Sequence, residues 1–209
     1  MGTLNYIVTK YDLNTAGRLP IEIPNVNRED LARLFHELGF TAGAEVGVEQ
    51  GRYSEVLCRE NPGLHLHCVD AWRAYKGYRE HVSQSKLDGF FEATQERLSG
   101  YTVTYHRGWS VEVAKTFNDS SLDFVYIDAN HEFKQVCDDL YAWLPKVKPG
   151  GIISGHDYIR RKSESYLCQV VELINGYTQA YHVKPWFVLG TKAVVGRRDR
   201  PRSWMWVKE

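Results

Sequence analysis

The sequence predicts an α/β fold whose sheet is mostly parallel and covered by helices on both faces. Short apolar runs typical of buried strands alternate with longer segments in which apolar residues recur at helical spacing. Two of these runs end on an acid, Asp70 and Asp128, and a third follows Pro149-Gly150-Gly151, which ends the helical segment before it. This alternation is typical of a doubly wound sheet built from strand–helix–strand units.

The first regular helix of the pattern begins after an N-terminal extension. Residues 1–26 show no clear period. Asn27 is a favourable N-cap, Asp30 resembles the acid of a capping box, and Gly39 ends the apolar helical pattern. We therefore divide the chain into an extension, residues 1–26, and a single domain, residues 27–209, and we expect the extension to cover part of a substrate pocket.

The domain then alternates between strands and helices. Strands are expected at residues 44–48, 64–69, 101–106, 122–127 and 152–154. Helices are expected at residues 53–57, 87–98, 110–117, 133–147 and 167–174.

The C-terminal part shows an antiparallel pattern. Residues 186–189 and 192–195 are apolar runs that flank Gly190-Thr191, a two-residue loop with glycine first, as a type II′ turn requires. The sequence therefore predicts a C-terminal antiparallel hairpin. Residues 204–207 alternate in a way that predicts one more short strand.

Composition excludes several classes of protein. Lys plus Arg and Asp plus Glu both total 26, so the formal net charge is zero, which argues against a nucleic-acid binder. The apolar runs are too short for a membrane span, and the first residues lack the apolar core of a signal peptide, so a cytoplasmic location is expected. The four cysteines form no CxxC pair and are expected to be reduced rather than zinc ligands or disulfides.

A turn bracketed by glycines follows the first strand. Gly47 and Gly51 lead into a helix whose first amides favour a carboxylate or phosphate. Asp70 ends the next strand, 19 residues after Gly51, where an acid can accept both hydroxyls of a ribose. The spacing is GxxxG with Glu49 and Gln50 inside, not the GxGxxG of dinucleotide sites, which disfavours close approach of a pyrophosphate. The alternative is an ordinary strand–turn–helix whose glycines serve only the backbone.

At this point the chain resembles a known family. The segments AEVGVEQGRYSEVL, LHCVD, LDFVYIDANHEF and LPKVKPGGIISGHDY are similar to the successive motifs of class I S-adenosylmethionine-dependent methyltransferases, within the small-molecule O-methyltransferase-like group. The resemblance covers about residues 40 to 196. It implies a Rossmann-like sheet of seven strands and S-adenosylmethionine as cofactor. One departure is that the family's IDG becomes Ile127-Asp128-Ala129 here.

The resemblance also implies roles for individual residues. Glu45, Gly47 and Gly51 would form the loop under the methionine part of the cofactor. Tyr53 or Ser54 would bind the carboxylate of that methionine part. Asp70 would hold the ribose of the cofactor, and its adenine would contact Trp72, Trp109 and Ser110. Asp128 would lie beside the amino group of the cofactor's methionine part.

Candidate catalytic residues follow the fourth and fifth strands. His131 lies one helical turn after Asp128, and His156-Asp157 follows the next strand. A histidine, His131 or His156, can act as general base on a hydroxyl because imidazole titrates near neutral pH. Asp128 and Asp157 can instead bind Mg²⁺. We favour the base, because His156 replaces an oxygen ligand where metal-dependent relatives carry one, and histidine is a poor ligand for Mg²⁺.

The expected function is transfer of a methyl group from S-adenosylmethionine to a small molecule, most simply to a hydroxyl oxygen of a sugar or another hydroxylated metabolite. Two alternatives remain open: an NAD-dependent oxidoreductase, which the absent GxGxxG disfavours, and a cofactor-binding module without catalysis. Comparing the binding of S-adenosylhomocysteine with that of NAD distinguishes the methyltransferase from the oxidoreductase. Methyl transfer to a panel of metabolites distinguishes the methyltransferase from the non-catalytic module. The sequence carries no signal of oligomeric state.

Overall fold

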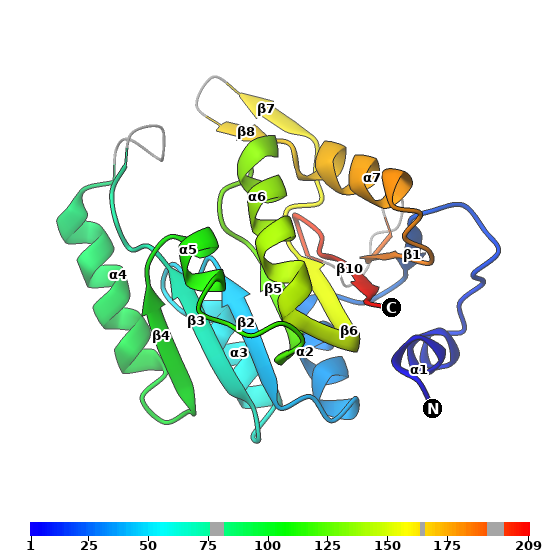
Figure 1. Cartoon of the computed structure of the whole chain (residues 1–209), viewed down its shortest axis with the longest axis horizontal. Coiled ribbons are helices and arrows are strands. Elements are labelled where there is room, and N and C mark those ends of the chain that lie inside the picture. Colours follow the sequence, from blue (N-terminus) through cyan, green and yellow to red (C-terminus); the bar gives the residue numbers. More distant parts are fainter. Residues whose placement is uncertain (76–81, 164–165, 192–198) are drawn as a thin grey trace.

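The computed structural model describes residues 1–75, 82–163, 166–191 and 199–209. A central sheet has helices on both faces (Figure 1). In the view of Figure 1, α6 crosses in front of the sheet, while α2 and α3 lie behind it. This is the doubly wound α/β architecture that the sequence predicts.

Among the described residues, eight strands form the sheet, in the order β1-β9-β10-β6-β5-β2-β3-β4. Their bounds are β1 Ile21–Ile23, β2 Ala42–Val46, β3 His65–Asp70, β4 Val103–Arg107, β5 Leu122–Ile127, β6 Val147–Gly155, β9 Phe187–Leu189 and β10 Trp204–Val207. The five strands from β6 to β4 are parallel to their neighbours, and β10 runs antiparallel to both β6 and β9.

Each face of the sheet has its own hydrophobic core. On one face lie α1 (Thr3–Lys10), α2 (Arg28–Glu37), α3 (Arg52–Glu60) and α4 (Gln84–Arg97), whose apolar side chains pack around the buried Phe35 and Phe124. On the other lie α5 (Ser110–Ala114), α6 (Phe133–Trp143) and α7 (Val170–Ala180), packed around Trp143 and Val125. A single turn of 3₁₀ helix, Leu144–Lys146, links α6 to β6.

The strand order places a binding site at the carboxyl ends of β2 and β5. The chain leaves β2 toward β3 on one side, while β5 pairs with β2 on the other. In open α/β sheets ligands bind where the strand order reverses in this way. Val46 pairs with both Val69 and Ile127, so the loops after β2, β3 and β5 leave the sheet at one level.

The sheet differs from the predicted one in strand number and in its C-terminal pairing. It has eight strands rather than seven, because the extension adds β1 parallel to β9. An antiparallel C-terminal pair is present, but the partner of β9 is β10, and the predicted partner at residues 192–195 lies outside the described residues. A small antiparallel hairpin, β7 (Arg161–Ser163) with β8 (Tyr166–Cys168), follows β6 where the sequence analysis expected no strand.

The extension is built into the fold. Ile7 of α1 and Ile23 of β1 are fully buried in the core under α2 and α3. Thr3 Oγ1 donates a hydrogen bond to the carbonyl oxygen of Gly150, in the first half of β6 and so away from the carboxyl ends of the strands. These contacts give residues 1–26 a structural role.

Two further expectations concern location and redox state. Among the described residues, no helix is long and apolar enough to cross a membrane. All four cysteines are free thiols, and Cys58, Cys68 and Cys168 are buried. Cys137 is partly exposed.

Candidate active site

A cavity of about 690 Å³ opens at the carboxyl ends of β2, β3, β5 and β6. Its wall includes most of the residues predicted from the sequence: Glu45, Gly47, Tyr53, Asp70, Trp109, Ser110, Asp128, His131, His156 and Asp157. The volume lies in the range of sites for small molecules and cofactors. One cavity therefore joins the predicted cofactor residues to the predicted catalytic residues.

The glycine loop has a backbone that only glycine tolerates at its key position. Gly47 has φ +91°, and a Cβ there would lie 2.2 Å from the carbonyl oxygen of Asp128. Gly51 has φ +69° and is the N-cap of α3, where a Cβ would lie 2.9 Å from Thr94 Cγ2. Glycine lacks the Cβ that makes such conformations costly. The two glycines allow β2 to turn sharply into α3 beside the end of β5.

Asp70 ties the loop to the end of β3. Its Oδ2 accepts hydrogen bonds from the amides of Val48 and Glu49, both at 3.0 Å, and its Oδ1 accepts one from the amide of Trp72 at 2.8 Å. A carboxylate has about four lone-pair sites, so after these three bonds Asp70 retains one, on Oδ1, for a hydroxyl donor of a ligand.

The two hydroxyls predicted to bind a carboxylate are committed inside the protein. The Ser54 hydroxyl is fully buried and donates to the buried carboxyl of Glu45, where burial raises the pKa of Glu45 to about 8. The Tyr53 hydroxyl donates to the carbonyl oxygen of Arg28 at 2.8 Å. Neither hydroxyl therefore keeps its proton for a ligand, and the sequence could not show this because both partners come from other elements.

The three residues predicted to contact the adenine lie in different environments. Trp72 is only 1% exposed, donates to the carbonyl oxygen of Glu49 and packs against Phe91, so its indole is part of the core behind the loop. Trp109 is 43% exposed on the cavity wall and meets Tyr75 edge-on. Ser110 also lies on the wall, and its Oγ accepts from Trp143 Nε1 at 2.8 Å. Trp109 is thus available to a ligand, whereas the Ser110 hydroxyl is already engaged with Trp143 and Asp139 and Trp72 supports the loop.

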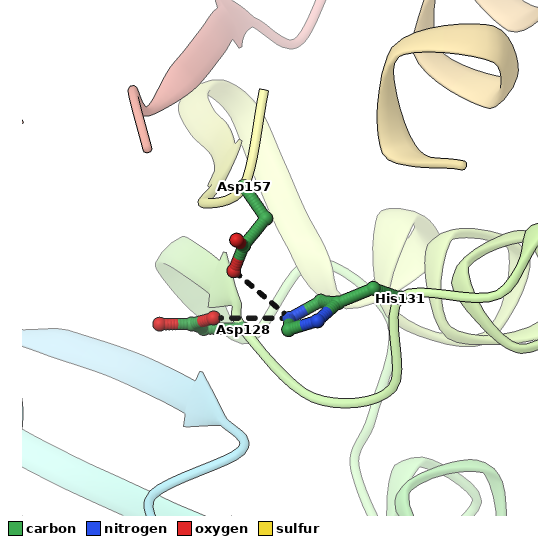
Figure 2. Close-up of side chains that lie close together, drawn as sticks. All are labelled: Asp128, His131 and Asp157. Carbon is green, nitrogen blue, oxygen red and sulfur yellow. Dashed lines mark hydrogen bonds and ion pairs between the residues drawn. The ribbon is translucent and has the colours of Figure 1, made fainter. Parts of the chain in front are cut away.

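Four side chains converge where β5 and β6 end. Figure 2 shows Asp128, His131 and Asp157 pointing toward one another: His131 Nε2 lies 3.0 Å from Asp157 Oδ2 and 3.4 Å from Asp128 Oδ1. His156 Nδ1 lies 3.3 Å from Asp157 Oδ2 and 3.6 Å from Asp128 Oδ2. The predicted catalytic residues therefore form one cluster.

Comparison with known proteins identifies the kind of domain that carries this cluster. A family model described as a methyltransferase domain matches residues 44–158. The chain belongs to this methyltransferase family. No curated protein matches the chain at a significant level.

Solved structures share the fold of this methyltransferase. One is the O-methyltransferase TomG from Streptomyces achromogenes, involved in tomaymycin synthesis and solved with S-adenosylmethionine; it is 16% identical, has a TM-score of 0.61, and the match covers 98% of this chain and 87% of that one. Another is an O-methyltransferase from Bacillus cereus solved with S-adenosylhomocysteine; it is 14% identical, has a TM-score of 0.59, and the match covers 99% and 87%. At these identities the likeness shows the fold.

Electrostatics in the methyltransferase cluster favour charged imidazoles. Burial by itself lowers the pKa of His131, but the carboxylates of Asp157 and Asp128 outweigh burial and raise it to about 9. The pKa of His156 is also raised, since contact with Asp157 and Asp128 again outweighs burial. Burial opposes ionisation of Asp157, yet the two imidazoles hold its pKa well below the usual range. His131 is therefore protonated at neutral pH.

The same residues fit a divalent cation. One ligand atom each from Asp128, His131 and Asp157 lie within 4.8 Å of one another. Two carboxylate oxygens and one imidazole nitrogen suit Mn²⁺, Fe²⁺ or Zn²⁺ better than Mg²⁺.

Two residues of the methyltransferase site were missed in the sequence analysis. Arg28 begins α2 and lines the cavity, with its guanidinium 3.9 Å from Asp128, 4.0 Å from Asp199 and over the ring of Tyr53. Asp199 also accepts from the backbone amide of Arg28 at 2.6 Å. The Asn27 capping box located the start of α2, but no local signal shows that this helix end meets the end of β5.

Proposed function

We propose that this methyltransferase transfers the methyl group of S-adenosylmethionine to a hydroxyl oxygen of a small-molecule acceptor. The observation that carries the proposal is the single cavity that joins a ribose-type acid, Asp70, to the cluster of Asp128, His131, His156 and Asp157. The two structural neighbours whose names report O-methyltransferase activity, solved with S-adenosylmethionine or S-adenosylhomocysteine, support this cofactor and this type of acceptor.

Within this proposal, the cofactor spans the switch point. Glu45, Gly47 and Gly51 shape the loop below its methionine part, Asp70 accepts a hydrogen bond from a ribose hydroxyl, and the adenine contacts Trp109 beside Ser110. Asp128 faces the amino group. The methionine carboxylate pairs with Arg28, because the Tyr53 and Ser54 hydroxyls are already donating elsewhere. The ion pairs of Arg28 with Asp128 and Asp199, at 3.9 and 4.0 Å, are longer than hydrogen bonds, which leaves its N–H groups able to turn to a ligand.

His156 is the proposed general base. Its Nδ1 faces Asp157 and Asp128, and its buried Nε2 has no hydrogen-bond partner among the described residues. A carboxylate that orients one imidazole nitrogen while the other meets a hydroxyl is the arrangement of a histidine base with its aspartate, and here a small movement of the ring must first uncover Nε2 toward the cavity. The imidazole of His131 lies between two carboxylates, which raise its pKa. His131 is the weaker base, because its imidazole is already protonated at neutral pH and cannot accept the proton of the acceptor hydroxyl.

A metal-dependent reaction is the second candidate, and the convergence of Asp128, His131 and Asp157 favours it. A divalent cation bound there would polarise the acceptor oxygen and lower the pKa of its hydroxyl. Since His131 is a poor ligand for Mg²⁺, we keep the base as the main proposal.

The acceptor is proposed to be a sugar or another hydroxylated metabolite. The cavity wall includes polar side chains such as Asn130, Gln135 and Asp138, and such groups can pair with the hydroxyls of an acceptor. The extension, residues 1–26, is left out of the acceptor pocket, because the first described residue along the chain that lines the cavity is Arg28.

Calorimetric titration tests the cofactor. S-adenosylhomocysteine is expected to bind and NAD is not. Asp70→Ala is expected to weaken binding by roughly 1.5 to 3 kcal/mol, the range for hydrogen bonds to a charged group. The control Asp119→Asn changes an acid that is 71% exposed and pairs with Lys146, and it should bind normally. NAD binding in place of S-adenosylhomocysteine would refute the proposal.

Transfer of labelled methyl from S-adenosylmethionine tests the reaction. A panel of sugars and other hydroxylated metabolites is expected to include an acceptor whose product carries an O-methyl group. Cofactor binding without transfer to any oxygen, nitrogen or carbon acceptor would favour the non-catalytic module. Transfer only to nitrogen or carbon would overturn the choice of oxygen.

A further inference from the structure

A second group of titratable side chains lies outside the cavity, on the two outer strands at one edge of the sheet. His65 and His67 of β3 are two residues apart, so their side chains share one face. On β4, Thr104 pairs with His67 and His106 pairs with Val69, which brings Thr104 and His106 to the same face. β4 is the last strand of the sheet (Figure 1).

The imidazoles of this group meet at ligand-like spacing. His67 Nδ1 and His106 Nε2 lie 3.0 Å apart and share a hydrogen bond, whose proton a metal ion would replace, and the centroids of their rings are 5.3 Å apart. Two nitrogens bound at about 2.0–2.1 Å to one metal ion are about 2.9–3.4 Å apart at angles of 90–109°. His65 flanks them, with its ring 4.5 Å from that of His67 and its Nε2 2.8 Å from Thr104 Oγ1.

We propose that His67 and His106 bind a divalent transition-metal ion of the Cu²⁺, Ni²⁺ and Zn²⁺ class, at a site separate from the methyltransferase cavity. The proposal rests on the geometry of these two strands and is independent of the proposed function.

A groove gives an ion access to the two rings. It has a volume of about 290 Å³ and is lined by His67, His106, Phe117, Asn118 and Ser121, among others. A water molecule occupies about 30 Å³ in the liquid, so the groove has room for an ion with several waters. Phe117 packs against both rings, at 4.9 Å from His67 and 5.3 Å from His106, and holds them side by side.

The chemistry of the groove selects the metal class. Neutral imidazoles are ligands for Cu²⁺, Ni²⁺ and Zn²⁺, whereas Mg²⁺ and Ca²⁺ require several oxygens. Over the part of the chain that the structure describes, no carboxylate lines this groove. Burial and the neighbouring His65 and His106 lower the pKa of His67 to about 4, and burial and His65 lower that of His106. Imidazole binds a metal ion in its neutral form.

The site has two protein ligands. In the described residues, a convergence of three candidate ligands occurs at Asp128, His131 and Asp157 and not in this groove. Water completes the coordination, so binding is expected to be weaker than at a closed structural zinc site. The ion would join β3 and β4 three residues before Asp70 and Trp109, and so it should raise the thermal unfolding midpoint.

The experiment compares metal binding by the full chain and four variants. Zn²⁺ affinity is measured by calorimetry, and nitrogen hyperfine structure is recorded by electron paramagnetic resonance at one equivalent of Cu²⁺. His67→Gln and His106→Gln should each weaken Zn²⁺ binding more than tenfold, since loss of even a supporting group costs 10- to 100-fold. His36→Gln, which alters an exposed histidine on α2, should bind as the wild type does.

The fourth variant, His131→Gln, separates this site from the active-site cluster. It should lose any Zn²⁺ binding at the active-site cluster but retain the Zn²⁺ site that His67→Gln abolishes, together with a Cu²⁺ spectrum with two imidazole nitrogens. Circular dichroism confirms that each variant is folded. Unchanged Zn²⁺ affinity in folded His67→Gln and His106→Gln, or loss of the Cu²⁺ spectrum in His131→Gln alone, would overturn the proposal and move the metal to the cavity.

Discussion

Gly47 lies directly against the backbone of Asp128. The amide of Asp128 donates to the carbonyl oxygen of Val46 at 2.7 Å, and a Cβ on Gly47 would come within 2.2 Å of the Asp128 carbonyl oxygen. The glycine loop and the end of β5 that carries Asp128 therefore share one close backbone contact, and a change in one displaces the other.

Gly47→Ala is expected to lower the affinity for S-adenosylhomocysteine at least tenfold and to reduce turnover as well. The added Cβ meets backbone, which cannot move aside cheaply, and φ +91° is unfavourable for alanine by about 1–2 kcal/mol. Calorimetry and a turnover assay measure the two effects. The matched control is Gly89→Ala in α4, where a Cβ meets nothing within 4 Å; it should bind normally and be more stable by about 0.5–1 kcal/mol. Normal binding in folded Gly47→Ala would show that the loop does not hold the cofactor.

His156→Gln is expected to reduce turnover about 10²- to 10⁴-fold with little change in cofactor affinity, the usual contribution of a general base. The wild-type rate should fall as pH drops through the pKa of His156, which lies above its ordinary 6.5, because the protonated imidazole cannot accept the acceptor's proton. Rate measurements across pH 6 to 9 with and without EDTA check both statements. His182→Gln, at an exposed histidine, is the control. If EDTA abolishes activity and Mn²⁺ or Mg²⁺ restores it, the metal-dependent reaction replaces the base.

Asp139 on α6 is expected to make stability fall as pH rises from about 4 to 6. Burial, helped by Asp138, outweighs a hydrogen bond from Ser110 and raises the pKa of Asp139 from 3.8 to about 6. A carboxyl group whose pKa is higher in the folded state favours folding when protonated, and this advantage is lost as it ionises. At about 1.36 kcal/mol per pKa unit, the loss is about 3 kcal/mol.

Urea unfolding of Asp139→Asn tests this linkage. The variant should match the wild type near pH 4 and exceed it at pH 7 by about 2–3 kcal/mol, because the amide carries no charge to bury. Asp12→Asn, at an exposed acid, is the control and should follow the wild type at both values. Equal stability of Asp139→Asn and wild type at pH 7 would show that the carboxyl is solvated.

Ile23→Ala is expected to lower the free energy of unfolding by about 2–5 kcal/mol, the cost of truncating a buried aliphatic side chain. Turnover of the folded fraction and its cofactor affinity should not change, since β1 lies in the core and away from the cavity wall. Thermal or urea unfolding together with steady-state kinetics measures both. An altered KM for the acceptor with wild-type stability would indicate that residues 1–26 cover part of the acceptor pocket, as the sequence analysis expected. Deleting residues 1–26 is a poorer test, because it removes four buried aliphatic side chains, Ile7, Ile21, Ile23 and Val26, at about 1.5–3 kcal/mol each, comparable to the whole stability of a domain.

The alternating strands and helices, the capping box at Asn27 and the glycine turn were all predictable from local sequence. Each of these features depends on the short repeat of apolar residues in a strand or helix, or on contacts between residues a few positions apart in the sequence. That Asp70, Asp128 and His156-Asp157 line one cavity was predictable for a related reason: side chains that follow parallel strands emerge at one edge of the sheet. Local periodicity and strand polarity thus encode the architecture and the edge at which chemistry takes place.

Which side chains are free to act depends on contacts between distant segments. The sequence predicts Tyr53 and Ser54 as ligands of a carboxylate, but in the structure their hydroxyls donate to Arg28 and Glu45. Arg28 enters the site because the start of α2 packs beside Asp199, 171 residues away in the chain. Residues 21–23 become an eighth strand because they pair with β9 near the other end of the sequence. Hydrogen-bond partners and burial depend on how distant segments pack in the folded molecule, so they cannot be predicted from the local sequence pattern.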